Sequence, residues 1–237
     1  MGRVICIGLG PGDPDLMSVK ARRILQEAPL VAYFRKPGRR GMARSIVEGL
    51  LAERVEEWAM EYPLTTEISV DDPGYNAALA PFYDDWAARL RDEAARRDVV
   101  VLCEGDPLLY GSFMHLQRRL PAELVEIVPG IPGMVGCWNV VGLPMTWGDD
   151  VLTVLPATLS EEELAQRLAG SDAVVVMKLG RNLDKLRRAL ERAGRLDEAW
   201  LVEHGTMEGQ RIARLAEFPG KAGYFSIALL HGQGRRP

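Results

Sequence analysis

The chain has 237 residues, of which 47% are hydrophobic and 26% charged, and its formal net charge is −4. This composition is typical of a soluble globular protein with room for one large domain or two small ones. The negative charge argues against a general nucleic-acid binder. The apolar runs are far shorter than the roughly 20 residues that a membrane-spanning helix needs. The three cysteines lie far apart in the sequence, so we expect reduced thiols and a cytoplasmic location.

The first half of the chain predicts a largely parallel α/β domain. The β-α-β order of its first elements predicts that two strands, 3–8 and 30–34, form a parallel pair. The stretch 99–103 has no polar break, which predicts a central strand that is buried on both faces. Further strands are expected at 55–58 and 125–128. Helices are expected from the capping residue Ser18 onward and at 42–51, 76–97 and 113–120.

The second half predicts a smaller α/β domain. The stretch 142–150 is dense in turn-forming residues, and we place the boundary there, which gives domains 1–145 and 146–237. Ser160 and Glu163 match a capping box, and Asn182 is expected to cap a second helix. Strands are expected at 151–155, 173–178, 200–203, 211–215 and 224–230.

Glycine-rich loops follow four of the apolar strands, beginning at Gly8, Glu104, Pro129 and Lys178. In open α/β sheets, ligands bind at the carboxyl ends of the strands, so the loops indicate a small-molecule site. A dinucleotide fingerprint is disfavoured because Asp13 stands where its third glycine belongs. Pro11 also removes a backbone donor there, and no Gly-Lys-Ser/Thr sequence follows as a Walker loop requires.

Five motifs together resemble the tetrapyrrole methylase family. They are GLGPGDP at 8–14, EGDP at 104–107 followed by YG at 110–111, PGI at 129–131, MKLG at 177–180 and EHGT at 203–206. The resemblance implies a two-domain α/β enzyme, usually a homodimer, in which each domain is a parallel or mixed sheet flanked by helices. It also implies that S-adenosylmethionine binds in a cleft between the domains, with no metal.

The resemblance implies the residues that contact this cofactor. Pro11 would pack in the cleft, the main chain of 104–106 would line the cofactor, and Leu109 would cover it. Many family members carry hydroxyl residues where this chain has Pro132 and Gly133, so no side-chain hydroxyl is expected at that point. The full set of expected cofactor contacts is Pro11, Glu104, Gly105, Asp106, Leu109, Pro132, Gly133, Met177 and Gly205. From the residues alone, Met177 is more typical of a core position.

Within the family, YPLTT at 62–66 and ARSI at 43–46 resemble the branch that methylates C20 of precorrin-2. We expect the metal-free tetrapyrrole as substrate, with the cobalt-containing form or another tetrapyrrole as alternatives. A basic loop, defined here as 35–41, holds four cations that could pair with the substrate's carboxylates: Arg35, Lys36, Arg39 and Arg40. A solvated basic loop without a ligand is the alternative.

The catalytic base is left open by the sequence. Related uroporphyrinogen methylases carry an aspartate at the end of the second strand, where this chain has Phe34. Four polar residues near strand ends are weak candidates for a base: Tyr110, Glu203, His204 and Tyr224. A module that binds the cofactor or a tetrapyrrole without catalysis is the non-enzyme alternative.

Overall fold

The computed structural model describes residues 2–63 and 73–234. Leu64, Thr65 and Thr66 of the YPLTT motif lie outside these residues. The chain divides into two compact units, Met1–Gly133 and Met134–Pro237. The turn-rich stretch 142–150 belongs to the second unit. The expected domain boundary after residue 145 stays a prediction.

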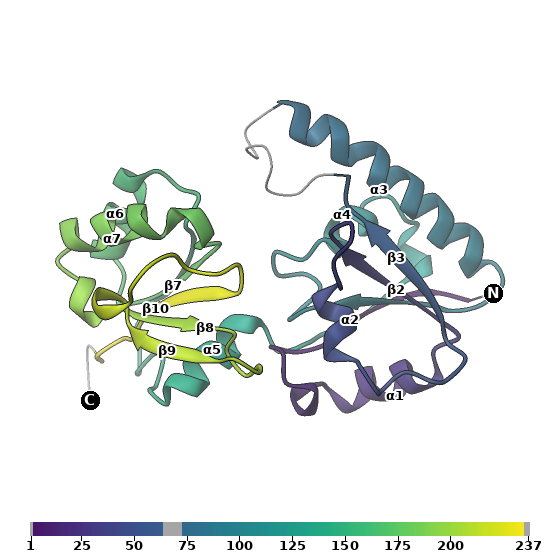
Figure 1. The fold of residues 1–237 in the computed structure, drawn as a ribbon, viewed down its shortest axis with the longest axis horizontal. Coiled ribbons are helices and arrows are strands. Elements are labelled where there is room, and N and C mark those ends of the chain that lie inside the picture. The colour runs from purple at the N-terminus through teal and green to yellow at the C-terminus, as the bar shows by residue number, and fades with distance from the viewer. Residues whose placement is uncertain (1, 64–72, 235–237) are drawn as a thin grey trace. The chain divides into compact units, whose positions relative to one another are not determined.

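The first unit is built on a sheet of five parallel strands (Figure 1). They are β1 (Val4–Gly8), β2 (Leu30–Arg35), β3 (Glu56–Glu61), β4 (Val99–Cys103) and β5 (Val125–Val128), in the order β3-β2-β4-β1-β5. The expected pairing of β1 with β2 is wrong, because β4 lies between them and pairs with both. The prediction that 99–103 is the central strand is confirmed.

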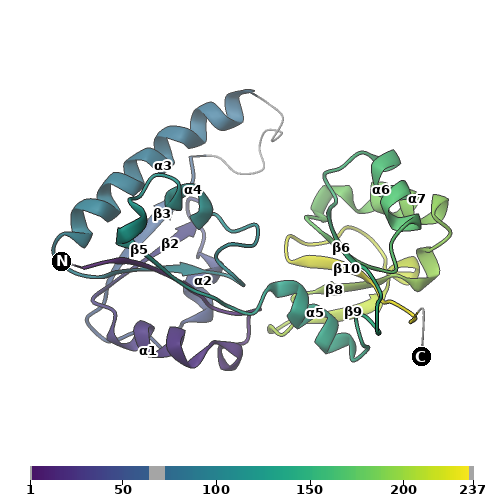
Figure 2. The same cartoon turned by 180° about the vertical axis from the view of Figure 1, so that it is seen from behind.

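Helices cover both faces of this sheet (Figures 1 and 2). The strands alternate, as in β4, where Val99 and Val101 face one helix layer and Val100 and Leu102 face the other. The first layer holds α3 (Pro73–Ala94) and α4 (Phe113–Gln117), and the second holds α1 (Val19–Glu27) and α2 (Met42–Ile46). The expected helix 42–51 therefore ends early, at Ile46.

The second unit is built on a mixed sheet in the order β6-β7-β10-β8-β9. Its strands are β6 (Leu152–Pro156), β7 (Ala173–Met177), β8 (Trp200–Glu203), β9 (Arg211–Arg214) and β10 (Ser226–Leu230). Strands β6 and β7 are parallel, and the other pairs are antiparallel. One face packs against α6 (Glu161–Ala169) and α7 (Leu183–Arg192), and the other against α5 (Gly133–Val141).

Local signals account for some of these boundaries and miss others. The capping box of Ser160 and Glu163 is confirmed. Asn182 takes the N-cap position of α7, but its side chain donates to the carbonyl oxygen of Lys178 (3.2 Å) and caps nothing. Helix α5 was not expected, because its glycines and β-branched residues are weak helix formers. Within 2–63 and 73–234, every helix is too short or too polar to cross a bilayer.

Candidate functional site

Three glycines bring the loops after β1, β4 and β5 into backbone contact. A Cβ atom on Gly130 would lie 2.2 Å from the carbonyl oxygen of Gly105, and one on Gly8 would lie 2.5 Å from the nitrogen of Gly130. Gly10 and Gly105 also exchange main-chain hydrogen bonds, with Gly105 N–H donating to Gly10 at 2.9 Å. Only glycine permits this approach, so the carboxyl edge of the first sheet carries a closely packed backbone platform.

Gly105 also contacts the segment after Pro129. A Cβ atom on Gly105 would lie 3.3 Å from the nitrogen of Gly133 and 3.6 Å from Cα of Pro132. The structure therefore brings Gly105, Pro132 and Gly133 together, three of the residues expected at the cofactor site. Pro11 is buried in the loop after β1, and Leu109 is half-buried in the loop after β4.

The carboxylate of Asp106 fastens two of these loops to each other. Its Oδ1 accepts a hydrogen bond from Leu108 N–H (2.9 Å), and its Oδ2 accepts one from Gly130 N–H (3.1 Å). The sequence assigned this residue to the site through its backbone alone. The structure adds that the side chain holds the loop after β4 against the loop after β5.

Non-glycine residues with a left-handed backbone conformation are concentrated in the loops that the sequence singled out. Among the described residues, positive φ angles outside glycine occur at Tyr110 (56°), Lys178 (59°), His204 (50°) and Thr206 (67°). Each follows β4, β7 or β8. Such conformations cost of order 1–3 kcal/mol and gather at functional sites. No sequence signal identifies them, because these residue types are common elsewhere.

Large apolar side chains are exposed around the same edge of the first unit. Leu108, Tyr110 and Ile131 are 48%, 44% and 37% exposed, and Leu16 after β1 is 38% exposed. Exposed apolar groups that gather on neighbouring loops are typical of a ligand-binding surface. This surface suits a ligand that is partly apolar and is gripped by main-chain groups.

Arg35 and Arg40 of the basic loop have carboxylate partners. Arg35 binds Glu61 (2.6 Å), and Arg40 binds Glu48 (2.6 Å). Both pairs are solvent-accessible, so each contributes little to stability and can exchange partners. Arg39 is exposed at the loop's tip. The loop returns to β2 at Gly41, where a Cβ atom would lie 2.7 Å from the carbonyl oxygen of Phe34.

The second unit holds the remaining expected contacts, Met177 and Gly205. Met177 is the last residue of β7, and Gly205 follows β8. These two strands run in the same direction on either side of β10. Met177 is half-buried and packs with the core on the α5 side of the sheet. A Cβ atom on Gly205 would lie 2.8 Å from Sγ of Cys137 in α5. Burial raises the pKa of Cys137 to about 12, so its thiol stays protonated and is no nucleophile.

The four candidate bases differ in their surroundings. Glu203 is buried, and its Oε1 accepts hydrogen bonds from Gly223 N–H (2.7 Å) and the Ser226 hydroxyl (3.1 Å). Its other oxygen pairs with Arg211 (3.2 Å). Tyr110 and Tyr224 are exposed, and His204 is half-buried beside the ring of Phe225. Glu203 is therefore committed to structure.

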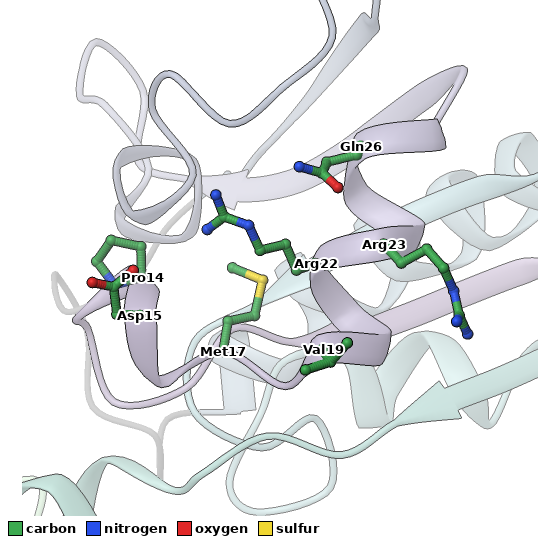
Figure 3. Close-up of a pocket in the computed structure, with 7 residues that line it drawn as sticks. All are labelled: Pro14, Asp15, Met17, Val19, Arg22, Arg23 and Gln26. Carbon is green, nitrogen blue, oxygen red and sulfur yellow. The ribbon is translucent and has the colours of Figure 1, made fainter.

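A separate hollow of about 390 Å³ lies between α1 and the short 3₁₀ helix η1 (Pro14–Leu16). Figure 3 shows the side chain of Arg22 extending over it and that of Arg23 pointing away. The hollow is open, and its walls come from one continuous stretch of chain. The loops after β1, β4 and β5, in contrast, converge from separate parts of the chain, so we place the candidate site at the strand ends.

The chain is similar to known proteins over most of its length. The family model described as Tetrapyrrole (Corrin/Porphyrin) Methylases matches residues 3–218. The chain is 50% identical to a precorrin-2 C(20)-methyltransferase from Sinorhizobium sp, covering 100% of this chain and 98% of that protein. It is 28% identical to a cobalt-precorrin-2 C(20)-methyltransferase from Salmonella typhimurium, covering 90% and 88%.

A solved structure extends the comparison to the fold. The uroporphyrin-III C-methyl transferase from Thermus thermophilus, complexed with S-adenyl homocysteine, superposes with a TM-score of 0.67 at 26% identity. The superposition covers 97% of this chain and 92% of that one. The two-sheet α/β architecture is therefore shared with a solved methyltransferase.

Proposed function

The chain belongs to the tetrapyrrole (corrin/porphyrin) methylase family, and from that premise we propose that it methylates C20 of precorrin-2. The products would be precorrin-3A and S-adenosylhomocysteine. The observation that carries the proposal is the 50% identity, over the full chain, to a protein with this name. Identity to the cobalt-precorrin-2 enzyme is 28%, which supports the metal-free substrate over the cobalt form.

The loops of the first unit fit the methyl donor. S-adenosylmethionine supplies the reactive methyl sulfonium when it is bound, so the protein's task is to bind, orient and exclude water. The glycine platform at Gly8, Gly105 and Gly130 packs the main chains of three loops closely together at one sheet edge, and Leu108 and Ile131 offer exposed apolar surface there. Orientation of this kind contributes up to roughly 7–11 kcal/mol to lowering a barrier.

The expected cofactor contacts of the first and second units are supported by different observations. Gly105, Pro132 and Gly133 lie close together, and Pro11 lies in the loop after β1 at the same sheet edge, which supports these four residues as cofactor contacts. Met177 and Gly205 of the second unit are proposed from the family resemblance, with their position at the ends of β7 and β8 in support.

The basic loop is proposed to bind the carboxylates of the macrocycle. It follows β2, at the same sheet edge as the loops after β1, β4 and β5. Arg39 is exposed, while Arg35 and Arg40 sit in accessible ion pairs that an anionic ligand can replace. Bidentate binding of a carboxylate is the geometry to which a guanidinium is best suited.

We further propose that the enzyme is a cytoplasmic homodimer. The resemblance to the family supports both points. The three cysteines are buried free thiols, which is compatible with a reducing compartment.

Glu203 provides a test of the proton's route. Replacing Glu203 with glutamine keeps an acceptor for Gly223, so we expect kcat to change by less than about threefold, whereas loss of a general base costs roughly 10²–10⁴-fold. Glu203→Ala strands the Gly223 N–H and should lower the free energy of unfolding by about 1–3 kcal/mol. Steady-state methyl transfer and urea unfolding measure the two effects. A drop in kcat of a hundredfold or more in the glutamine variant would make Glu203 the base.

The proposed function is tested by binding and by product analysis. Calorimetry with S-adenosylhomocysteine should give a dissociation constant in the micromolar range, and a flat titration would count against the assignment. Incubation with precorrin-2 and methyl-¹³C-labelled cofactor should place the label on C20 by NMR. Label on another carbon would contradict the regiochemistry, and faster turnover of cobalt-precorrin-2 would reverse the substrate preference.

A further inference from the structure

The loop after β4, residues 104–112, is the proposed donor loop, and the basic loop is the proposed acceptor loop. A hydrogen bond from the first residue of the donor loop joins it to α2, the helix that follows the basic loop. Oε1 of Glu104 accepts a hydrogen bond from Ala43 N–H (3.0 Å). Ala43 lies in the first turn of α2, directly after the basic loop. The side chain of Glu104 therefore holds α2, the helix that follows the basic loop, against the start of the donor loop.

A second tie lies at the far end of the same loop. The hydroxyl of Tyr62 donates a hydrogen bond to Oγ of Ser112. The main-chain N–H of Tyr62 donates to the carbonyl oxygen of Arg35 (3.1 Å), and its ring stacks on Phe34, with centroids 5.3 Å apart and planes 13° from parallel. Tyr62 thus joins the start of the basic loop to the end of the donor loop.

The backbone between these ties needs support. Tyr110 has a φ of 56°, a conformation that persists only where its surroundings hold it. The turn is also closed at Gly111, where a Cβ atom would lie 2.7 Å from the carbonyl oxygen of Pro107. Ser112 is the next residue, so its bond to Tyr62 fixes the exit of a strained turn.

We propose that Tyr62 is a positioning residue for methyl transfer: through Ser112, its hydroxyl sets the placement of the donor loop relative to the basic loop. This role rests on the proposed function, since it assigns the donor and the acceptor to these two loops. Tyr62 itself need touch neither reacting atom. A displacement near 1 Å between reacting groups can cost on the order of a hundredfold in rate, so a tie of this kind acts on kcat.

The fold should survive the loss of this hydrogen bond. The ring of Tyr62 packs with Phe34 and Phe82 whether or not it carries a hydroxyl. Ser112 stands at the N-cap position of α4 but makes no capping hydrogen bond, so Ser112→Ala does not uncap the helix. Tyr62→Phe therefore keeps these ring contacts, and Ser112→Ala removes no capping hydrogen bond.

The test is a double-mutant cycle in the full chain, with Tyr62→Phe, Ser112→Ala and the double variant. We expect each to lower kcat about tenfold, with the double variant no worse than either one, because the three changes remove the same bond. The KM for S-adenosylmethionine and the urea midpoint should stay close to those of the unmodified protein. Ser112→Thr, which keeps a hydroxyl, should restore most of the turnover.

Ser171→Ala serves as the matched control. It removes a hydroxyl that bonds Thr153 (2.8 Å) in the second unit, and turnover should not change. If the unmodified protein turns over while Tyr62→Phe and Ser112→Ala match it, the positioning role is wrong and the proposed function stands. Multiplying losses in the double variant, or a parallel rise in the cofactor's KM, would also overturn the role. No turnover by the unmodified protein would overturn the proposed function and this role with it.

Discussion

Replacing Gly130 with alanine is expected to destabilise the protein by about 3 kcal/mol, at the upper end of overpacking costs, and to abolish binding of S-adenosylhomocysteine. The new methyl group would lie 2.2 Å from the carbonyl oxygen of Gly105 and 2.7 Å from the carbonyl carbon of Gly8. Both obstacles are backbone, so no side chain can rotate away. The loop after β5 must move away from the loops after β1 and β4, which breaks the hydrogen bond from Gly130 N–H to Asp106. Urea unfolding and calorimetry measure the two losses.

Gly133→Ala is the matched control for stability. A Cβ atom at Gly133 meets nothing within 4 Å, and alanine favours the helix that begins there. The free energy of unfolding should therefore be unchanged or higher. If Gly130→Ala were as stable as Gly133→Ala, the close contact between the three loops would be wrong.

Asp106→Arg is expected to weaken binding of S-adenosylhomocysteine at least about a hundredfold, or roughly 2.7 kcal/mol. The substitution removes the acceptor of both Leu108 N–H and Gly130 N–H, so the loops after β4 and β5 lose their link. The larger side chain also fills the space beside the glycine platform. Calorimetry on the folded variant, checked by circular dichroism, gives the ratio of dissociation constants.

Asp106→Asn distinguishes the effect of losing a hydrogen bond from the effect of a larger side chain. The asparagine side chain has nearly the same shape and one amide carbonyl oxygen, so it can accept one of the two hydrogen bonds. We expect an affinity between those of the unmodified protein and the arginine variant. Near-normal binding by Asp106→Arg would mean that the cofactor site lies away from the loop after β4.

The sequence predicts the central strand of the first unit because burial on both faces leaves a clear apolar pattern. The run from Val99 to Cys103 is uniformly apolar, and it is the central strand. Strand order is a different matter. Local patterns carry no information on which strand inserts between β1 and β2, so the expected pair was wrong. Helix α5 escaped prediction because the stability of GMVGCWNVV comes from packing under the second sheet, and not from propensity.

The site was predictable where glycine or family motifs mark it. Gly8, Gly105 and Gly130 could be singled out by their places after apolar strands, and the structure brings them into contact. The tie between Tyr62 and Ser112 joins residues 50 apart in sequence, and neither residue type signals a partner. The hydrogen bond from Gly130 N–H to Asp106 could not be predicted either. It depends on the strand order, in which β1 lies between β4 and β5.

The most direct measurement is a crystal structure of this chain with S-adenosylhomocysteine bound. We expect the ligand to contact main-chain groups of 104–106 and 130–133 in the first unit, with Leu109 against it. Electron density for the adenosyl group elsewhere, for example in the hollow between η1 and α1, would contradict the assignment of the donor to the glycine platform.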